Sequence, residues 1–531
     1  MKFDYVIVGA GAAGSVLANR LSENPSNKVL LLEYGGADIN PMHYIPKGFF
    51  FTLRGERYSY HYPTQPIGPS GQIEAWTRGK VTGGSTTING MMYTRGAPAD
   101  YDAIVERGNP GWGWDDMLPA FKAMEDHQLG PSPMRGAGGP YGVSISEDDD
   151  EVTTAILAAA EKVGWQRSTD TNAHDDERIG FTPSSIKNGV RVSAASAFLR
   201  PALKRPNLTY LKRTKVGYLL FDGHRVVGVR ATRKGSGYQD YLAAKEVILS
   251  AGTIESTLLL ERSGIGRPEV LRGVGVDVVV ESPNVGERVI EQRGVSFQVK
   301  LKDQIGLTQR LNSVPKEGWE GFKYLLTRRG PIATGGYDLL SAFKSSPELE
   351  RPDIQGIWLP MALDASSPTM KLAKHSGFMF VGYKIRPTTE GSIHLGGRLP
   401  ENAPLINARF LETEEDRTAT SKILDRAREV VAQSPVADLV QEEEFPGPKV
   451  STPEEVLRYS IDTGGGIYHA IGSAAMGPND DDVVDSRLRV RGVSGLRVID
   501  ASVFRQQPSG NTAAPTMALA WRAADLIEQG E

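Results

Sequence analysis

Strand-like and helical patterns of apolar residues alternate at the start of the chain. Residues 5–8 form a short apolar run with the composition of a buried parallel strand. From Ala13 to Leu21 apolar residues recur at helical spacing, and residues 28–32 predict a second strand. The order strand, helix, strand predicts a βαβ unit at the start of the chain.

The middle and the end of the chain predict further elements. Residues 34–78 are rich in Gly, Pro and Tyr and predict irregular structure. Between 287 and 455, strand-like runs alternate with loops and helical stretches, one of them over 413–433. Pro515 predicts the start of a last helix that continues towards Ile527. Other predicted helices and strands cover 151–164, 208–211, 226–229, 246–249, 295–301, 378–385 and 392–395.

Length and composition are those of a soluble globular protein with two domains. A chain of 531 residues is too long for one compact core. Apolar residues make up 40% and charged residues 23%, which is ordinary. The net charge of −4 gives no reason to expect a nucleic acid or an anionic membrane as partner. No apolar run approaches the roughly 20 residues that span a bilayer.

The chain contains no cysteine, which excludes disulfides, thiolate nucleophiles and cysteine metal sites. No metal site of another kind is expected. The first strand begins at residue 3, so no signal peptide is expected before it. We therefore expect a cytoplasmic protein, either a monomer or a homodimer.

The loop between the first strand and helix has the G-x-G-x-x-G spacing. Gly9 allows a tight turn, Gly11 lets a pyrophosphate approach the backbone, and Gly14 lets helix and strand pack closely. The helix N-terminus, with Ala12 and Ala13, offers unpaired N–H groups to the phosphates. Glu33, at the end of the second strand, can accept hydrogen bonds from ribose hydroxyls and would repel a 2′-phosphate. The pattern favours FAD or NAD over NADP, and a glycine turn without a ligand is the alternative.

Two later segments carry further candidate residues. Residues 78–90 are dense in small residues and backbone donors. This composition is typical of a segment that lies against a flat or charged ligand. A glycine loop at a domain border is an equally good interpretation. Near the C-terminus, His469 follows a glycine-rich run and Asn511 follows Gly510. From these residues alone, a buried core histidine and a turn asparagine are favoured over catalytic groups.

Taken together, these motifs resemble the glucose-methanol-choline (GMC) family of flavoenzymes. The opening fingerprint and residues 78–90 resemble its first signature, and residues 250–257, continuing to 266, resemble its second, with Thr257 in place of the usual proline or serine. The resemblance covers essentially the whole chain. It implies an α/β (α+β overall) fold, in which a Rossmann-like FAD-binding domain is interleaved with a substrate domain built on a mostly antiparallel sheet backed by helices. The expected FAD-binding domain comprises residues 1–155, 200–290 and 456–531, and the substrate domain comprises 156–199 and 291–455.

The resemblance also implies roles for individual residues. It makes His469 the general base and Asn511 the group that fixes the alcohol oxygen. Some members bind the flavin covalently through a histidine at the position of Ile88, so FAD is expected to be noncovalent here. The backbone at Val216 is expected to meet the adenine. The residues expected to bind FAD are Gly9, Gly11, Ala12, Ala13, Gly14, Glu33, Arg78, Val81, Gly83, Gly84, Ser85, Asn89, Gly90, Val216, Ala251, Gly252, Tyr468, Asp500, Ala501 and Thr512.

The function implied by this resemblance is FAD-dependent oxidation of an alcohol. Proton abstraction by the histidine and hydride transfer to flavin N5 would give an aldehyde, and a further round would give an acid. The favoured substrates are primary alcohols, including aromatic ones. O2 or another acceptor would reoxidise the flavin. The alternatives are a non-redox lyase of the hydroxynitrile type that keeps FAD structurally, an NAD-dependent reductase and a flavin-binding protein without catalysis.

Overall fold

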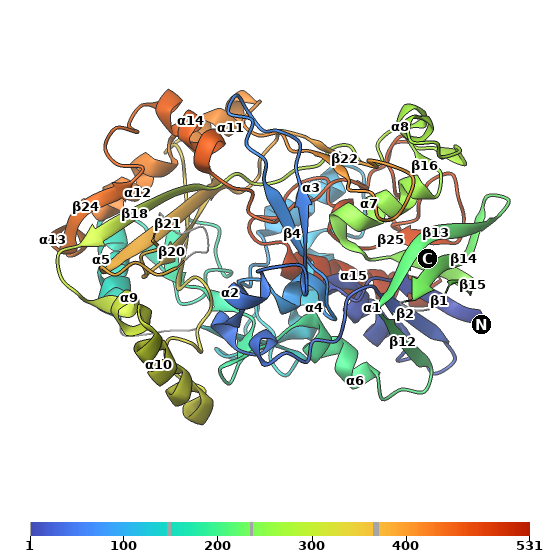
Figure 1. Ribbon diagram of the computed structural model, residues 1–531, viewed down its shortest axis with the longest axis horizontal. Coiled ribbons are helices and arrows are strands. Elements are labelled where there is room, and N and C mark those ends of the chain that lie inside the picture. The colour runs from blue at the N-terminus through green and yellow to red at the C-terminus, as the bar shows by residue number, and fades with distance from the viewer. Residues whose placement is uncertain (1, 146–149, 234–236, 365–370, 531) are drawn as a thin grey trace.

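The computed structural model describes residues 2–145, 150–233, 237–364 and 371–530. Two seven-stranded sheets lie at opposite ends of an elongated molecule, and irregular segments and short helices lie between them (Figure 1). Each sheet is the centre of its own large apolar cluster.

The first sheet is built on the predicted βαβ unit. β1 (Lys2–Val8) pairs in parallel with β2 (Val29–Glu33) and with β15 (Tyr238–Leu249). β2 is buried along its whole length, as expected for an apolar strand covered on both faces. In register, Val8 lies opposite both Leu32 and Leu249, so the strands end at one edge of the sheet. The other strands of this sheet are β12 (Leu208–Lys212), β13 (Thr214–Asp222), β14 (Arg225–Arg233) and β25 (Leu496–Val498).

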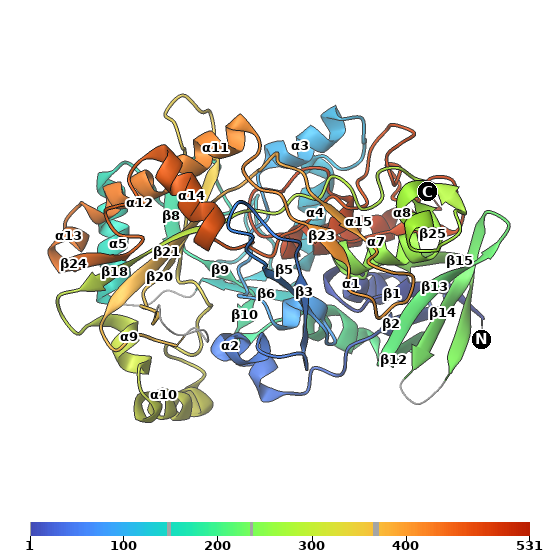
Figure 2. The ribbon, with the colours of Figure 1, turned by 45° about the horizontal axis from the view of Figure 1, so that its top comes forward.

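Helices from both ends of the chain cover this sheet. α1 (Ala12–Leu21) packs against α15 (Ala513–Glu528), and α15 in turn contacts α4 (Trp114–Met124), as Figures 1 and 2 show. The buried side of α15 is rich in alanine, which lets neighbouring helices approach closely. The first and last helices of the chain therefore form one layer.

The second sheet is mostly antiparallel. Its order is β24 (Val440–Phe445), β18 (Val295–Leu301), β21 (Gly377–Lys384), β20 (Ile354–Leu359), β19 (Leu339–Phe343), β8 (Arg178–Phe181) and β7 (Gln166–Arg167). Only the short β7–β8 pair is parallel among these described strands. α5 (Glu151–Lys162) and α12 (Ile423–Val431) pack on it over an aromatic core that includes Phe297, Trp358 and Phe380. The expected fold class is confirmed.

The remaining elements connect the two sheets or extend from them. They are η1 (Pro41–His43), η2 (Pro46–Gly48), α2 (Phe49–Thr52), β3 (Ser59–Pro63), β4 (Ala75–Gly79), η3 (Gly84–Thr87), α3 (Pro98–Glu106), β5 (Glu125–His127), β6 (Tyr141–Ile145), β9 (Pro183–Ser184), β10 (Ile186–Lys187), β11 (Val190–Arg191), η4 (Ala195–Leu199), α6 (Arg200–Ala202), α7 (Gly252–Arg262), β16 (Ile265–Gly266), α8 (Pro268–Gly273), β17 (Val280–Glu281), α9 (Gly306–Leu311), α10 (Val314–Thr327), β22 (Ser392–His394), β23 (Leu405–Asn407), α11 (Glu414–Ser421), α13 (Val436–Leu439), α14 (Pro453–Thr463) and η5 (Ala501–Val503).

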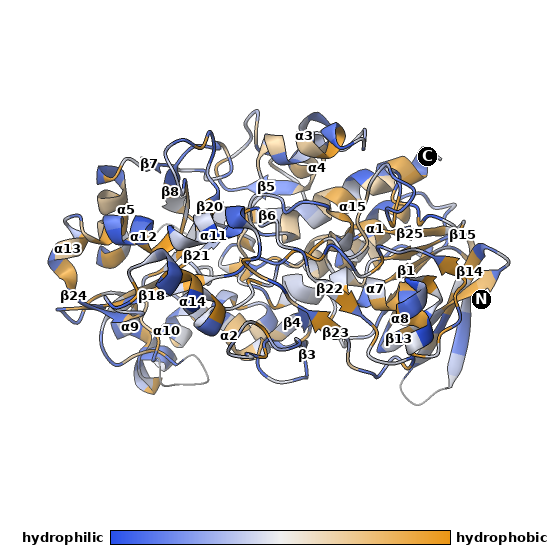
Figure 3. Cartoon of the chain, turned by 90° about the horizontal axis from the view of Figure 1, so that it is seen from above, coloured by the Kyte–Doolittle hydropathy of each residue, from blue (hydrophilic) through white to orange (hydrophobic). Residues whose placement is uncertain are grey.

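The division of the chain into domains at residues 155, 199, 290 and 455 stays a prediction. Buried side chains of α5 pack in the core of the second sheet, and those of η4 pack in the core of the first. Hydrophilic and hydrophobic residues are interspersed along the chain in both halves of the molecule (Figure 3).

Three local predictions were wrong. Within 34–78, β3 and β4 form an antiparallel pair, since aromatic side chains such as Tyr60 and Tyr62 stack along it. The stretch 413–433 contains two helices, α11 and α12, rather than one. α15 begins at Ala513, so Pro515 is its third residue; proline is accepted there because that N–H also lacks an intrahelical acceptor.

A charged cluster ties the small β22–β23 hairpin to α7. His394 of β22 lies between two carboxylates, with Nδ1 2.7 Å from Glu261 of α7 and Nε2 3.2 Å from Glu287. Burial would lower the pKa of His394, but the hydrogen bonds to Glu261 and Glu287 outweigh it and raise the pKa to about 9. The protonated ring therefore bridges two elements that are distant in sequence.

This bridge predicts a pH-dependent stability. Because the folded pKa of His394 exceeds its unfolded value of about 6.5, its contribution is complete below pH ~6.5 and is lost as the pH rises to about 9. We expect a loss on the order of 2 kcal/mol in the free energy of unfolding over that range. In denaturant titrations, His394→Gln should reduce this loss, and His224→Gln, in the exposed β13–β14 turn, should leave it unchanged. Equal pH profiles for His394→Gln and the wild type would contradict the assignment.

Candidate active site

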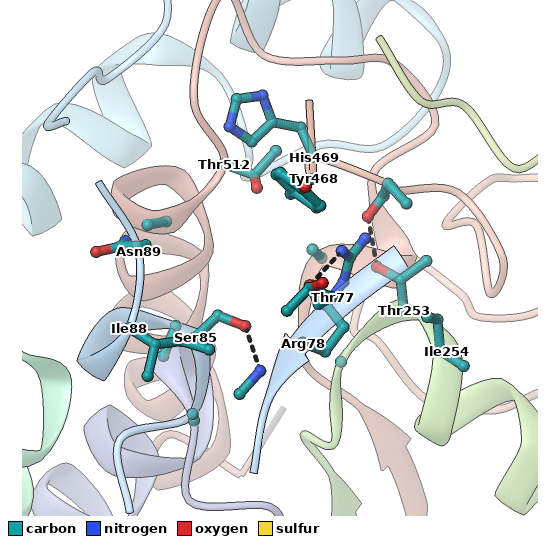
Figure 4. A pocket seen from close by; sticks show the side chains of 18 of the residues that line it. Thr77, Arg78, Ser85, Ile88, Asn89, Thr253, Ile254, Tyr468, His469 and Thr512 are labelled. Carbon is teal, nitrogen blue, oxygen red and sulfur yellow. Dashed lines mark hydrogen bonds between the residues drawn. The ribbon is translucent and has the colours of Figure 1, made fainter. Parts of the chain in front are cut away.

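A cavity of about 550 Å³ extends from the strand ends of the first sheet to the face of the second. Gly9, Leu32 and Ser250 line it at the carboxyl ends of β1, β2 and β15, the edge at which open α/β sheets bind ligands. Ile357 of β20 and Met379 of β21 line its other end. Figure 4 shows side chains of the central part.

The glycine loop after β1 leaves room for a ligand where the motif predicts it. Gly9 has φ 101°, in the left-handed region that glycine favours. A Cβ on Gly14 would lie 1.8 Å from the Gly9 carbonyl oxygen, so this glycine permits close packing of α1 on the loop. A Cβ on Gly11 would meet no atom within 4 Å, because this residue borders the open cavity. The first N–H groups of α1, at Ala12 and Ala13, lack intrahelical acceptors and suit a pyrophosphate.

Glu33 ends β2 beside this loop. Its Oε2 accepts a hydrogen bond from the Ala10 N–H (2.9 Å) and its Oε1 accepts one from the Gly35 N–H (2.6 Å). Burial raises the pKa of this carboxyl. The group is thus fixed in the cavity wall, where each oxygen keeps a lone pair for ribose hydroxyls.

The segment from Arg78 to Gly90 crosses the middle of the cavity. A Cβ on Gly84 would lie 2.8 Å from the Gly11 Cα, so the two glycine segments are in contact. Figure 4 shows Ser85, Ile88 and Asn89 on one side of the cavity and Arg78 on the other. The backbone of this segment therefore forms part of the cavity wall.

Asp500 lies two residues beyond the end of β25, at the N-cap of η5, and is held by protein donors. Its Oδ2 accepts from the Gly252 N–H (2.9 Å) and the Ser256 hydroxyl (2.5 Å), and its Oδ1 accepts from the Ser502 N–H (2.9 Å) and hydroxyl (2.6 Å). This carboxylate joins the start of α7 to η5. Its predicted contact with a cofactor stays a prediction, although it lines the cavity.

His469 lies at the other end of the cavity, and Gln292 fixes its tautomer. Gln292 Nε2 donates to the Ile385 carbonyl oxygen (2.6 Å), so its Oε1 is the atom 2.7 Å from His469 Nδ1. Because this oxygen can only accept, Nδ1 carries the proton. The lone pair of His469 is then on Nε2.

The side-chain amide of Asn511 donates a hydrogen bond to that lone pair. Its Oδ1 lies 3.4 Å from the Thr94 hydroxyl and 3.3 Å from Gln355 Nε2, and both groups donate to it. Its Nδ2 is therefore directed at His469 Nε2, at 2.9 Å. A hydroxyl that lies beside both groups, in place of their direct contact, could receive a hydrogen bond from Asn511 and give its own proton to His469.

The surroundings keep this imidazole neutral. Burial, and then the positive charge of Arg78, lower the pKa of His469 to about 3. Glu291 Oε1 accepts from the backbone N–H of His469 (2.8 Å), and its Oε2 lies 3.7 Å from Arg78 Nη2. Burial raises the pKa of Glu291 to about 7, although the charge of Arg78 acts in the opposite direction.

Sequence reasoning missed Glu291 and Gln292. They lie in an irregular segment just before β18, and Gln292 meets His469 across 177 residues. No spacing in the sequence indicates such a contact.

The cavity lies against most of the predicted site residues. Those that line it are Gly9, Gly11, Ala12, Ala13, Glu33, Arg78, Gly84, Ser85, Asn89, Gly90, Val216, Ala251, Gly252, Tyr468, His469, Asp500, Ala501, Asn511 and Thr512. Gly14, Val81 and Gly83 are outside the lining: Gly14 packs on the Gly9 carbonyl, Val81 is fully buried, and a Cβ on Gly83 would press on Thr87. The individual contacts with FAD stay predictions.

Two family models described as GMC oxidoreductase match residues 3–292 and 387–520. Over 99% of this chain, 35% of residues are identical to the oxygen-dependent choline dehydrogenase of Vibrio vulnificus, of which 94% is covered. The identity is also 35% to the mitochondrial choline dehydrogenase of Homo sapiens, over 99% of this chain and 90% of that protein.

Solved structures agree with these matches. Pyridoxine 4-oxidase from Mesorbium loti superposes with a TM-score of 0.89 and 28% identity, covering 99% of each chain. Formate oxidase superposes with a TM-score of 0.91 and 26% identity, covering 100% of this chain and 98% of the other. The chain belongs to the GMC oxidoreductase family, and is accordingly an FAD-dependent oxidoreductase that acts on alcohol-type substrates.

Proposed function

We propose that this protein oxidises a neutral primary alcohol, aromatic ones in particular, to the aldehyde, with His469 as the base. The observation that carries the proposal is the buried, neutral His469, whose Nε2 faces Asn511 at 2.9 Å on the cavity wall. Nε2 takes the hydroxyl proton, Asn511 holds the oxygen, and Gln292 keeps the ring in the required tautomer. Bound FAD supplies the acceptor for the hydride that leaves the carbinol carbon.

The cavity wall supports a neutral, apolar substrate. Near His469 the lining residues include Tyr337, Ile357, Val381 and Tyr383. The acidic residues of the lining are Glu33 of β2, Glu255 of α7 and Asp500 at the start of η5, and each is bonded to protein donors. The basic residue Arg78 also lines the cavity, with its Nη2 3.7 Å from Glu291. A quaternary ammonium alcohol, the substrate named for the choline dehydrogenases, would find no carboxylate partner among the described lining residues near His469.

FAD is proposed to be held without a covalent bond, since Ile88 offers no nucleophile. Acid precipitation should then release the flavin into the supernatant. O2 or another acceptor reoxidises the enzyme, and oxidation of the aldehyde hydrate to the acid would use the same base.

The base assignment predicts a specific defect in His469→Ala. FAD should remain bound, because His469 lies at the far end of the cavity from the glycine loop, but flavin reduction should slow by about 10²-fold or more. Anaerobic stopped-flow absorbance measures this rate. Reduction at the wild-type rate would remove His469 from the role.

The tautomer assignment predicts that Gln292→Leu slows flavin reduction by about 10-fold or more, because Nδ1 loses the acceptor that orients the ring. The reduction rate should fall more than the apparent affinity for the alcohol. Gln298→Leu, a buried amide of β18 bonded to the Leu363 backbone, is the matched control and should leave the rate unchanged. Equal effects of the two variants would mean that Gln292 has only a structural role.

Substrate class is tested by anaerobic addition of benzyl alcohol or choline to the oxidised holoenzyme. Benzyl alcohol should bleach the flavin at least 10-fold more efficiently, since the walls near His469 are apolar and the described lining there includes no carboxylate for a cation. Faster bleaching by choline would overturn the substrate proposal, and no bleaching by any alcohol would favour the non-redox lyase alternative.

A further inference from the structure

α10 exposes an unusual number of large apolar side chains. Exposed fractions are 82% for Val314, 59% for Trp319, 53% for Phe322, 63% for Leu325 and 71% for Leu326. Figure 1 shows α10 extending from the body of the molecule at the end that carries the second sheet. A soluble protein rarely exposes so many large apolar residues on one element.

These side chains form one continuous face. At about 100° per residue, the five positions fall within an arc of about 140°, in which the other residues are Pro315 and Gly318. The opposite side of the helix holds it to the protein: Tyr324 is buried, and its hydroxyl donates to the Gly189 carbonyl oxygen (2.9 Å). The apolar face is therefore held outward.

Basic residues border this face. Residues 310–329 contain five basic and two acidic residues, a net charge of +3 in a chain whose net charge is −4. One of the two acids, Glu320, is buried and lies 2.7 Å from Lys323 Nζ and 3.5 Å from Arg310 Nε. Lys316 and Lys323 follow one edge of the apolar arc, and Arg328 and Arg329 follow the helix end.

We propose that α10 docks this protein on the surface of an anionic lipid bilayer. Trp319, Phe322 and Leu326 would enter the boundary between head groups and acyl chains, and the basic residues would contact lipid phosphates. The helix lies in the plane of the surface: its 14 residues are about 21 Å long, less than the roughly 30 Å of a hydrocarbon core. No helix within the described part of the chain is long and apolar enough to cross a membrane.

Charge favours a bilayer over a second copy of the chain. Two copies joined through α10 would bring two segments of charge +3 together, whereas anionic head groups complement that charge. The sequence expectation of no membrane partner followed from the net charge of the whole chain, which conceals this local basic segment.

Cosedimentation of the holoenzyme with vesicles tests the proposal. The wild type should sediment with phosphatidylglycerol-containing vesicles, much less with phosphatidylcholine alone, and less at high salt. Trp319→Ser/Phe322→Ser should lower the bound fraction by about 10-fold or more, and Lys316→Glu/Lys323→Glu should also lower it. The matched control is Ile73→Ser/Leu399→Ser, which removes two apolar side chains exposed elsewhere and should bind as the wild type does. Unchanged turnover in solution shows that each variant is folded.

Three outcomes would overturn the proposal. The first is no sedimentation with either vesicle, and the second is an equal loss in the Ile73→Ser/Leu399→Ser control. The third is a dimer in light scattering without lipid that Trp319→Ser/Phe322→Ser converts to a monomer, which would assign the face to a second copy.

Discussion

Neutrality of one buried imidazole is the condition on which the site depends. His469 can accept a proton only while Nε2 is unprotonated, and burial beside Arg78 keeps it unprotonated at physiological pH. Its two partners, Gln292 and Asn511, are neutral amides. A carboxylate at Nδ1 would orient the ring equally well, but it would favour the charged form and raise the pKa. The amide therefore provides orientation without changing the protonation state, in a region where burial makes charge costly.

The hydrogen bonds around His469 join segments that belong to both sheets. His469 lies in a loop that leads back to the first sheet, whereas Gln292 precedes β18 of the second and Gln355, which orients Asn511, lies on β20. A site made of these groups requires the chain to pass between the sheets repeatedly. Their separate cores supply the rigidity that holds hydrogen bonds of 2.7 to 3.3 Å across the junction.

Local signals in the sequence were enough to predict the βαβ unit, its glycine loop and Glu33, because each rests on spacing within a few residues. His469 required the family resemblance, since a histidine among small residues is ambiguous by itself. Gln292 could not be found, because its role depends on a contact 177 residues away. The β3–β4 pair was missed because Gly and Pro in 34–78 concealed its aromatic alternation, and periodicity alone cannot tell which side of α10 faces the protein.

Pairing of α1 with α15 has a consequence for biosynthesis. The layer that covers the first sheet is incomplete until the last helix is made, and β25 joins β15 only after residue 498 has been synthesised. The nascent chain therefore leaves the ribosome with its dinucleotide fold open on one side. Until α15 is made, the apolar side of α1 that it covers stays exposed to solvent, and such exposed apolar surface favours aggregation of a nascent chain.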